Sequence, residues 1–181
     1  MAKWRLIGLG ACLAVAAMSF SWFTGRSGRG VPQNQTGEEV LCTDRYTCYS
    51  ASSLSEFGPG REIVAIGEPP PATKSDVAGV IYESQSNLTV SDAHFLNALP
   101  NLFLLGLADC SATRDFWELL DVSRLRYLYL DNSNSNDNDC KYIARGQKLE
   151  YVSVFQSSIS KEGKSILKSG VPAISINDWY R

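Results

Sequence analysis

The chain has 181 residues, of which 44% are hydrophobic and 20% are charged, and its formal net charge at pH 7 is -2. This length accommodates one domain and an extension, and the nearly balanced charge argues against a nucleic-acid-binding protein, because phosphate-driven binding requires clustered Lys and Arg. The single histidine, His94, leaves little scope for histidine-based metal or acid–base chemistry, and five cysteines are too few for a disulfide scaffold of this length.

Residues 1–24 predict a helix that enters a membrane. A basic start precedes an uncharged run of 18 residues, Leu6 to Phe23, which lies between a signal-peptide core and the roughly 20 apolar residues of a transmembrane helix. Ser19 and Ser21 suit cleavage after Ser21, so a single-pass anchor and a cleaved signal peptide both stay open, with a lipid anchor on Cys12 as a minor alternative. We therefore expect a membrane-anchored protein or a secreted or periplasmic one.

Residues 25–60 are rich in Gly, Ser, Gln, Asn and Pro and lack a sustained apolar period, which predicts a flexible linker. Within it, Cys42 and Cys48 form a disulfide loop if the compartment is oxidising, and otherwise stay as two thiols. Glu62 to Gly67 predicts a short strand, which a run of three prolines ends. We place the folded domain at residues 61–181.

One apolar pattern recurs through this domain at intervals of 22 to 25 residues. The pattern is apolar-x-x-apolar-x-apolar, and its five copies are Val77/Val80/Tyr82, Leu102/Leu105/Leu107, Leu125/Leu128/Leu130, Leu149/Val152/Val154 and Val171/Ile174/Ile176. Each copy predicts a short strand whose apolar side chains face a core. Matching strands at such intervals are typical of repeat proteins.

A carboxylate follows each of the first four patterns and introduces a short helical pattern. These carboxylates are Asp92, Asp115, Asp139 and Glu162. A carboxylate at a helix start stabilises the free N–H groups of the first turn. The apolar residues expected to face the core lie four positions later, at Leu96, Leu119, Ile143 and Ile166.

These units resemble those of the leucine-rich repeat family, particularly bacterial forms with a V/I-S/T-D-A-G-L step between strand and helix. Val90-Ser91-Asp92-Ala93 and Ile159-Ser160-Lys161-Glu162-Gly163 carry that step. The resemblance covers about residues 75–181 and implies an α/β leucine-rich repeat solenoid, with parallel strands on the concave face and short helices on the convex face. The N-terminal transmembrane or signal helix and the flexible linker precede it. The resemblance also implies ligand binding, mostly of proteins, and no catalytic activity.

The concave face of such a solenoid supplies the candidate site. Residues between the apolar positions point outward, which brings together Tyr127, Tyr129, Tyr151 and Phe155, with Asp131 beside them. Aromatic residues with polar groups are enriched in protein-recognition surfaces, although tyrosines also simply suit strands. We predict a non-catalytic protein-binding module that needs no cofactor or metal; the alternative is a structural or assembly subunit of a larger membrane-associated complex.

The segment Asp131–Asp139 carries oxygen donors at alternate positions, as calcium-binding EF-hand loops do. Its sixth position is Asn136 instead of glycine, and its twelfth is Tyr142 instead of glutamate. Since Asn, Asp and Ser also form tight turns and helix caps, a solvated connecting loop is favoured over a calcium site. An enzyme that uses Asp131 or Asp139 lacks a supporting group of residues.

Overall fold

The computed structural model describes residues 45–51, 54, 73–82 and 84–178. The N-terminal helix predicted at residues 1–24 and the strand predicted at Glu62–Gly67 lie outside these residues. Cys42 does so too, so its disulfide with Cys48 stays a prediction.

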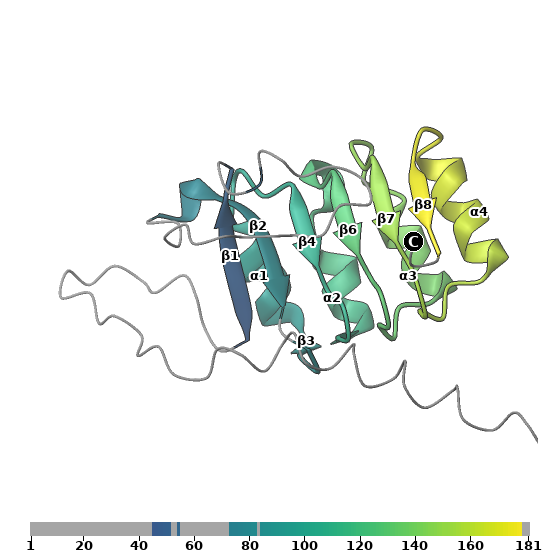
Figure 1. Ribbon diagram of the computed structural model, residues 1–181, viewed down its shortest axis with the longest axis horizontal. Coiled ribbons are helices and arrows are strands. Elements are labelled where there is room, and N and C mark those ends of the chain that lie inside the picture. The colour runs from purple at the N-terminus through teal and green to yellow at the C-terminus, as the bar shows by residue number, and fades with distance from the viewer. Residues whose placement is uncertain (1–44, 52–53, 55–72, 83, 179–181) are drawn as a thin grey trace, which may run out of the picture. The chain divides into compact units, whose positions relative to one another are not determined.

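Six strands form one sheet in the order β1-β2-β4-β6-β7-β8, visible side by side in Figure 1. Their bounds are Tyr46–Ser50 (β1), Val77–Tyr82 (β2), Leu104–Gly106 (β4), Tyr127–Tyr129 (β6), Tyr151–Ser153 (β7) and Ser175–Asn177 (β8). From β2 to β8 each strand runs parallel to its neighbour, and the residues aligned across them are Val80, Leu105, Leu128, Val152 and Ile176. Two short strands, β3 (Asn87–Leu88) and β5 (Ser111–Ala112), form a separate parallel pair.

Four α-helices contribute to one core with the sheet; in Figure 1 the last of them stands beside β8 at the right end of the sheet, and the others lie behind the strands. The four helices are α1 (Val90–Asn97), α2 (Arg114–Leu119), α3 (Asp137–Ile143) and α4 (Lys161–Gly170), and two 3-10 turns, η1 (Lys74–Asp76) and η2 (Val122–Arg124), accompany them. Each α-helix has a carboxylate in its first turn, as the sequence predicted. In α1 the Asp92 carboxylate accepts a hydrogen bond from the Thr89 backbone N–H at 2.8 Å, and in α3 Asp139 accepts one from Asn136 N–H at 2.9 Å.

The core between the helices and the sheet, which we call the helix-facing core, is mainly aliphatic. Its fully buried members include Val80, Leu96, Leu105, Leu128, Ile143, Val152 and Leu167. The prediction for Leu119 was wrong, because this side chain is 43% exposed. Helix α2 has only six residues, and it buries Phe116 and Trp117 instead.

The expectation of a leucine-rich repeat solenoid was wrong: the fold is mixed α/β with a mixed sheet. Strand β1 pairs antiparallel with β2, with Thr47 opposite Ile81, and it lies within the stretch predicted as a flexible linker. Its alternating side chains explain the pairing, since Cys48 is buried in the helix-facing core and the ring of Tyr46 lies 4.8 Å from that of Phe95. Burial of one face and completion of the edge of β2 stabilise a strand that composition alone did not indicate.

None of the helices at residues 45–51, 54, 73–82 and 84–178 is long and apolar enough to cross a membrane. The predicted anchor at residues 1–24 lies outside this part of the chain.

The register of the last strand also differs from the prediction. The recurring pattern aligned Val152 with Ile174, but Val152 is paired with Ile176. Helix α4 has ten residues, whereas α3 has seven. The chain therefore uses more residues in α4 than in α3 before it re-enters the sheet. Hydrogen bonds of β8 with β7 then determine the alignment.

Candidate functional site

The sheet face turned away from the helices carries a second apolar cluster. Its buried members are Leu54, Ala78, Leu104, Tyr127 and Tyr151, and its half-buried members are Tyr49, Ile81, Phe103 and Tyr129. We call this cluster the tyrosine face. Leu104, Tyr127 and Tyr151 are direct neighbours across β4, β6 and β7, so one continuous row of side chains crosses the middle of the sheet.

The structure brings all five predicted binding residues together around β6 and β7. Tyr127 is paired with Tyr151, and the ring centroids of Tyr129 and Tyr151 are 5.6 Å apart at an interplanar angle of 48°. Asp131 follows β6, and its Oδ1 atom accepts hydrogen bonds from the Ser153 hydroxyl at 2.6 Å and from the Phe155 N–H at 2.9 Å. The aromatic row and the strand-end carboxylate therefore form one connected region.

The five predicted binding residues are less exposed than expected for a binding surface. Tyr127 and Tyr151 are only 7% and 5% exposed, whereas Tyr129, Asp131 and Phe155 are half-buried. Tyr129, Asp131 and Phe155 are therefore the more accessible of the five side chains.

Burial also determines the charge of this region. Desolvation raises the pKa of Tyr129 far above its usual value, so the phenol stays neutral. Desolvation raises the pKa of Asp131 as well, while the hydrogen bonds from Ser153 and Phe155 oppose this shift. The face thus combines neutral aromatic rings with one partly desolvated carboxyl group.

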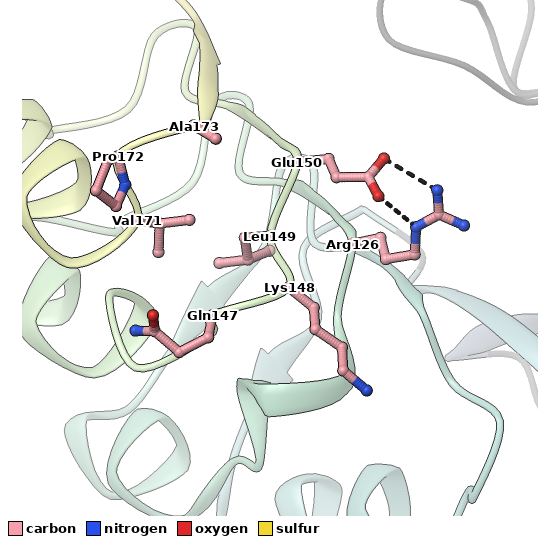
Figure 2. A pocket seen from close by; sticks show the side chains of 8 residues that line it. All are labelled: Arg126, Gln147, Lys148, Leu149, Glu150, Val171, Pro172 and Ala173. Carbon is pink, nitrogen blue, oxygen red and sulfur yellow. Dashed lines mark hydrogen bonds and ion pairs between the residues drawn. The ribbon is translucent and has the colours of Figure 1, made fainter.

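A charged pair borders the tyrosine face at the other end of the strands (Figure 2). Arg126 and Glu150 make two hydrogen bonds, Nε to Oε1 at 2.7 Å and Nη2 to Oε2 at 3.1 Å, and the contact with Arg126 lowers the pKa of Glu150. The Tyr127 hydroxyl donates to Glu150 Oε2 at 3.2 Å, and the Arg126 guanidinium lies 5.5 Å from the Tyr127 ring centroid. This arrangement connects the buried tyrosine row to an exposed pair of opposite charges.

The same pair stands beside a shallow pocket of about 370 Å³. Figure 2 labels its lining, which consists of Arg126, Gln147, Lys148, Leu149, Glu150, Val171, Pro172 and Ala173. The lining has no cysteine, serine or histidine nucleophile, and its carboxylate is held by arginine. The lining combines one arginine–glutamate ion pair with Gln147, Lys148 and four apolar side chains.

Several side chains of the Asp131–Asp139 segment form hydrogen bonds within the protein. Ser133 donates its hydroxyl to the Leu130 carbonyl at 2.7 Å, while Asn136 and Asp139 cap α3. Across the described part of the chain, no group of three or more His, Cys, Asp or Glu side chains is arranged to hold a metal ion. The predicted solvated loop is only partly exposed, since Ser133, Ser135 and Asp139 are buried.

Sequence reasoning missed the part of the face that comes from the N-terminal side. Tyr49 and Leu54 belong to the stretch predicted as linker, and Phe103 precedes β4 by one residue. The signal for Tyr49 was the alternation of Tyr46, Thr47, Cys48 and Tyr49, which is typical of a half-buried strand. No comparable local signal indicated Leu54.

Comparison with known proteins gives no further guide. The sequence matches no protein-family model, and none of the curated proteins is significantly similar to it. The resemblance to leucine-rich repeat proteins therefore depends on the sequence motifs alone.

Proposed function

We propose that this chain is a non-catalytic protein-binding module and that the tyrosine face is its binding surface. The observation that carries the proposal is the convergence of Tyr127, Tyr129 and Tyr151 on the sheet face opposite the four described α-helices. Asp131 and Phe155 lie at the strand ends beside them. Aromatic side chains that combine apolar area with a polar group are enriched at the centres of protein interfaces.

The chemistry of the surface favours a protein partner of mixed character. Tyr129 and Phe155 offer half-buried aromatic area, and Arg126 and Glu150 offer charges at the border, each 48% exposed. An apolar centre with a charged border is the usual anatomy of a recognition surface. The border charges are expected to orient a partner more than to hold it.

A permanent assembly subunit is the weaker proposal. Such a subunit exposes a contiguous apolar patch when it is isolated. Among the described residues, the one large apolar side chain classed as exposed is Leu119, and scattered single exposures are normal for monomeric proteins.

We also propose that the module is tethered to a membrane or exported across one. The support is the basic start and the uncharged run Leu6–Phe23. Arginines introduced by Leu13→Arg and Val15→Arg should release the chain into the soluble fraction or block its export. An unchanged distribution between membrane and soluble fractions would contradict the proposal.

Site-specific photo-crosslinking of the full chain tests the binding surface. A benzophenone amino acid is placed at Phe155, next to the tyrosine face, and for comparison at Tyr142, which is half-buried on helix α3. We expect a discrete crosslinked partner from position 155 and none from position 142. Crosslinks of equal yield from both positions, or from position 142 alone, would move the binding surface away from the tyrosine face.

A further inference from the structure

We infer that the outer edge of β8 binds an extended acidic segment of a partner protein, which joins the sheet as one further strand. This edge is a different surface from the tyrosine face, so the inference goes beyond the proposed function and does not depend on it. Two features support it: the backbone groups on the outer edge of β8, and three lysines on α4. We call Lys161, Lys164 and Lys168 the lysine row.

Strand β8 is the last strand of the sheet in the part of the chain that the structure describes. At the opposite end of the sheet, β1 pairs with β2 and covers its edge. No described strand covers the outer edge of β8, which lies at the right end of the sheet in Figure 1. Such an edge presents N–H and carbonyl groups with which another extended chain can pair.

The hydrogen bonds between β8 and β7 determine which backbone groups of β8 point outward. The Ser175 N–H donates to the Glu150 carbonyl at 2.9 Å. The Asn177 carbonyl accepts from the Val154 N–H at 2.8 Å. Since the backbone groups of successive residues alternate between the two edges of a strand, the N–H and the carbonyl of Ile176 point away from β7. Ile176 therefore offers one donor and one acceptor to an added strand.

The helix-facing core is incompletely covered at this end of the sheet. Ile176 on β8 and Ile166 on α4 are half-buried and pack against that core. Leu128 and Val152, which are aligned with Ile176 across the sheet, are fully buried. A strand beside β8 would cover Ile176 further, and burial of this apolar area would contribute to its binding.

The lysine row places positive charge beside the same edge. Its three lysines line one shallow pocket on α4. The Lys164 Nζ donates to the Oδ2 atom of Asp178, the residue directly after β8, at 2.7 Å. This hydrogen bond lowers the pKa of Asp178, and the charge of Lys168 acts in the same direction. Through Lys164 and Lys168, the lysine row therefore borders the end of β8.

The charge of the lysine row favours an acidic partner over a second copy of this chain. Two copies paired through β8 about a two-fold axis would place their lysine rows on the same side of the joined sheet, where like charges repel. An acidic segment is attracted instead, because Lys161 and Lys168 form no ion pair with any described residue. Side chains of an added strand alternate between its two faces, so we expect acidic side chains on the face turned towards α4.

Binding of labelled peptides to the full chain tests the chemistry of the segment, with fluorescence anisotropy as the measurement. The probe alternates threonine with glutamate. One control alternates threonine with lysine, and the other alternates proline with glutamate, which keeps the charge but cannot pair as a regular strand. We expect the probe to bind at least about tenfold more tightly than either control. No binding of the probe, or equal binding of the proline–glutamate peptide, would overturn the inference.

Two substitutions at one position test the backbone of β8. Ile176→Pro removes the outward N–H and leaves the hydrogen bonds to β7 in place, whereas Ile176→Ala loses a similar apolar area and keeps the N–H. We expect Ile176→Pro to bind the probe about tenfold more weakly than Ile176→Ala, or not at all. Equal affinities of the two variants would overturn the inference. Circular dichroism shows whether both fold, and if Ile176→Pro does not, the comparison of peptides on the unchanged chain decides.

Two pairs of substitutions test the lysine row. Lys161→Gln with Lys168→Gln should weaken binding of the probe about threefold to tenfold, and added salt should weaken it in the same direction. Lys141→Gln with Lys148→Gln, at exposed positions outside the row, should leave the affinity unchanged. Equal weakening by both pairs would reduce the effect to general charge attraction and overturn the inference. So would a dimer in analytical ultracentrifugation that Ile176→Pro abolishes, without binding of the probe, since a second copy would then occupy the edge.

Discussion

The helix-facing core and the tyrosine face lie on opposite sides of the same strands, yet they are built from different side chains. Adjacent residues show the contrast, since Leu104 and Tyr127 belong to the tyrosine face while Leu105 and Leu128 belong to the helix-facing core. The helix-facing core contains aliphatic residues that two layers of secondary structure enclose. The tyrosine face contains aromatic rings with polar groups, and Leu54 enters it from a turn.

This difference separates stability from recognition. Substitutions in an enclosed aliphatic core leave cavities that the surroundings fill poorly. Substitutions on the tyrosine face affect side chains that can readjust, because the described residues place no helix over that face. The largest losses of stability are therefore expected from the helix-facing core, and the changes in binding from the other face.

The largest expected effect comes from Leu128→Asp. Leu128 is fully buried in the helix-facing core, and an unpaired carboxylate there should cost more than about 4 kcal/mol, enough to prevent folding. Circular dichroism should show no cooperative melt, whereas Lys148→Asp, at an exposed position, should melt like the wild type. A normal cooperative melt of Leu128→Asp would contradict the assignment of the core.

A pair of adjacent leucines sharpens the comparison. Leu104 and Leu105 are both fully buried, on opposite faces of β4. We expect Leu105→Ala to lower the free energy of unfolding by about 3 to 5 kcal/mol and Leu104→Ala by about 2 kcal/mol, since the Leu54 side chain can relax into the smaller gap. Urea denaturation measures both losses, and equal values would show that the two faces are packed alike.

A smaller effect is expected from Asp131→Asn, and it depends on pH. Burial raises the pKa of Asp131 in the folded state above its unfolded value of about 3.9. The folded state therefore keeps a proton that the unfolded state has already released, so the carboxyl group makes the wild type less stable as pH rises through this window. Asn removes this dependence and retains the oxygen that accepts both hydrogen bonds, which go to Oδ1.

Melting temperatures between pH 3 and 7 measure this effect. The Asn variant should match the wild type near pH 3 and melt slightly higher at pH 7. A variant that melts lower at pH 7 than the wild type would show that the carboxylate charge itself stabilises the fold.

The smallest expected effect belongs to the charged border. Arg126 and Glu150 are each 48% exposed, so a double-mutant cycle with Arg126→Ala and Glu150→Ala should give a coupling of about 0.2 to 1 kcal/mol. The coupling should decrease as salt is added, since solvent screens exposed charges. A coupling free energy above this range that does not decrease with salt would show that the Arg126–Glu150 pair contributes substantially to the stability of the fold.

Local patterns predicted a substantial part of this structure. The spacing of Leu105, Leu128 and Val152 predicted side-by-side strands, and these residues are aligned as expected. The carboxylates Asp92 and Asp139 predicted helix starts that the structure confirms. The candidate site was predicted as a group of residues, and the structure brings that group together, although the burial of Tyr127 and Tyr151 was not foreseen.

Apart from the exposed Leu119, the errors involve contacts between segments distant along the chain. Strand β1 lies in a stretch whose composition predicted a linker, and it becomes a strand because the edge of β2 supplies hydrogen bonds and Cys48 finds a core. The register of β8 depends on how many residues α4 uses before the chain returns. Neither the pairing of β1 with β2 nor the length of α4 can be predicted from a short stretch of sequence.

The amino-acid sequence by itself determined which residues alternate within each strand and where each helix begins, because both follow from the two-residue and 3.6-residue periods of the backbone and from capping by nearby side chains. Only the tertiary structure decided that the sheet is mixed, that β8 is shifted by two residues, and that Leu54 lies on the tyrosine face. These outcomes depend on which distant segments form the better hydrogen bonds and apolar contacts with one another. Such contacts exist only in the folded chain.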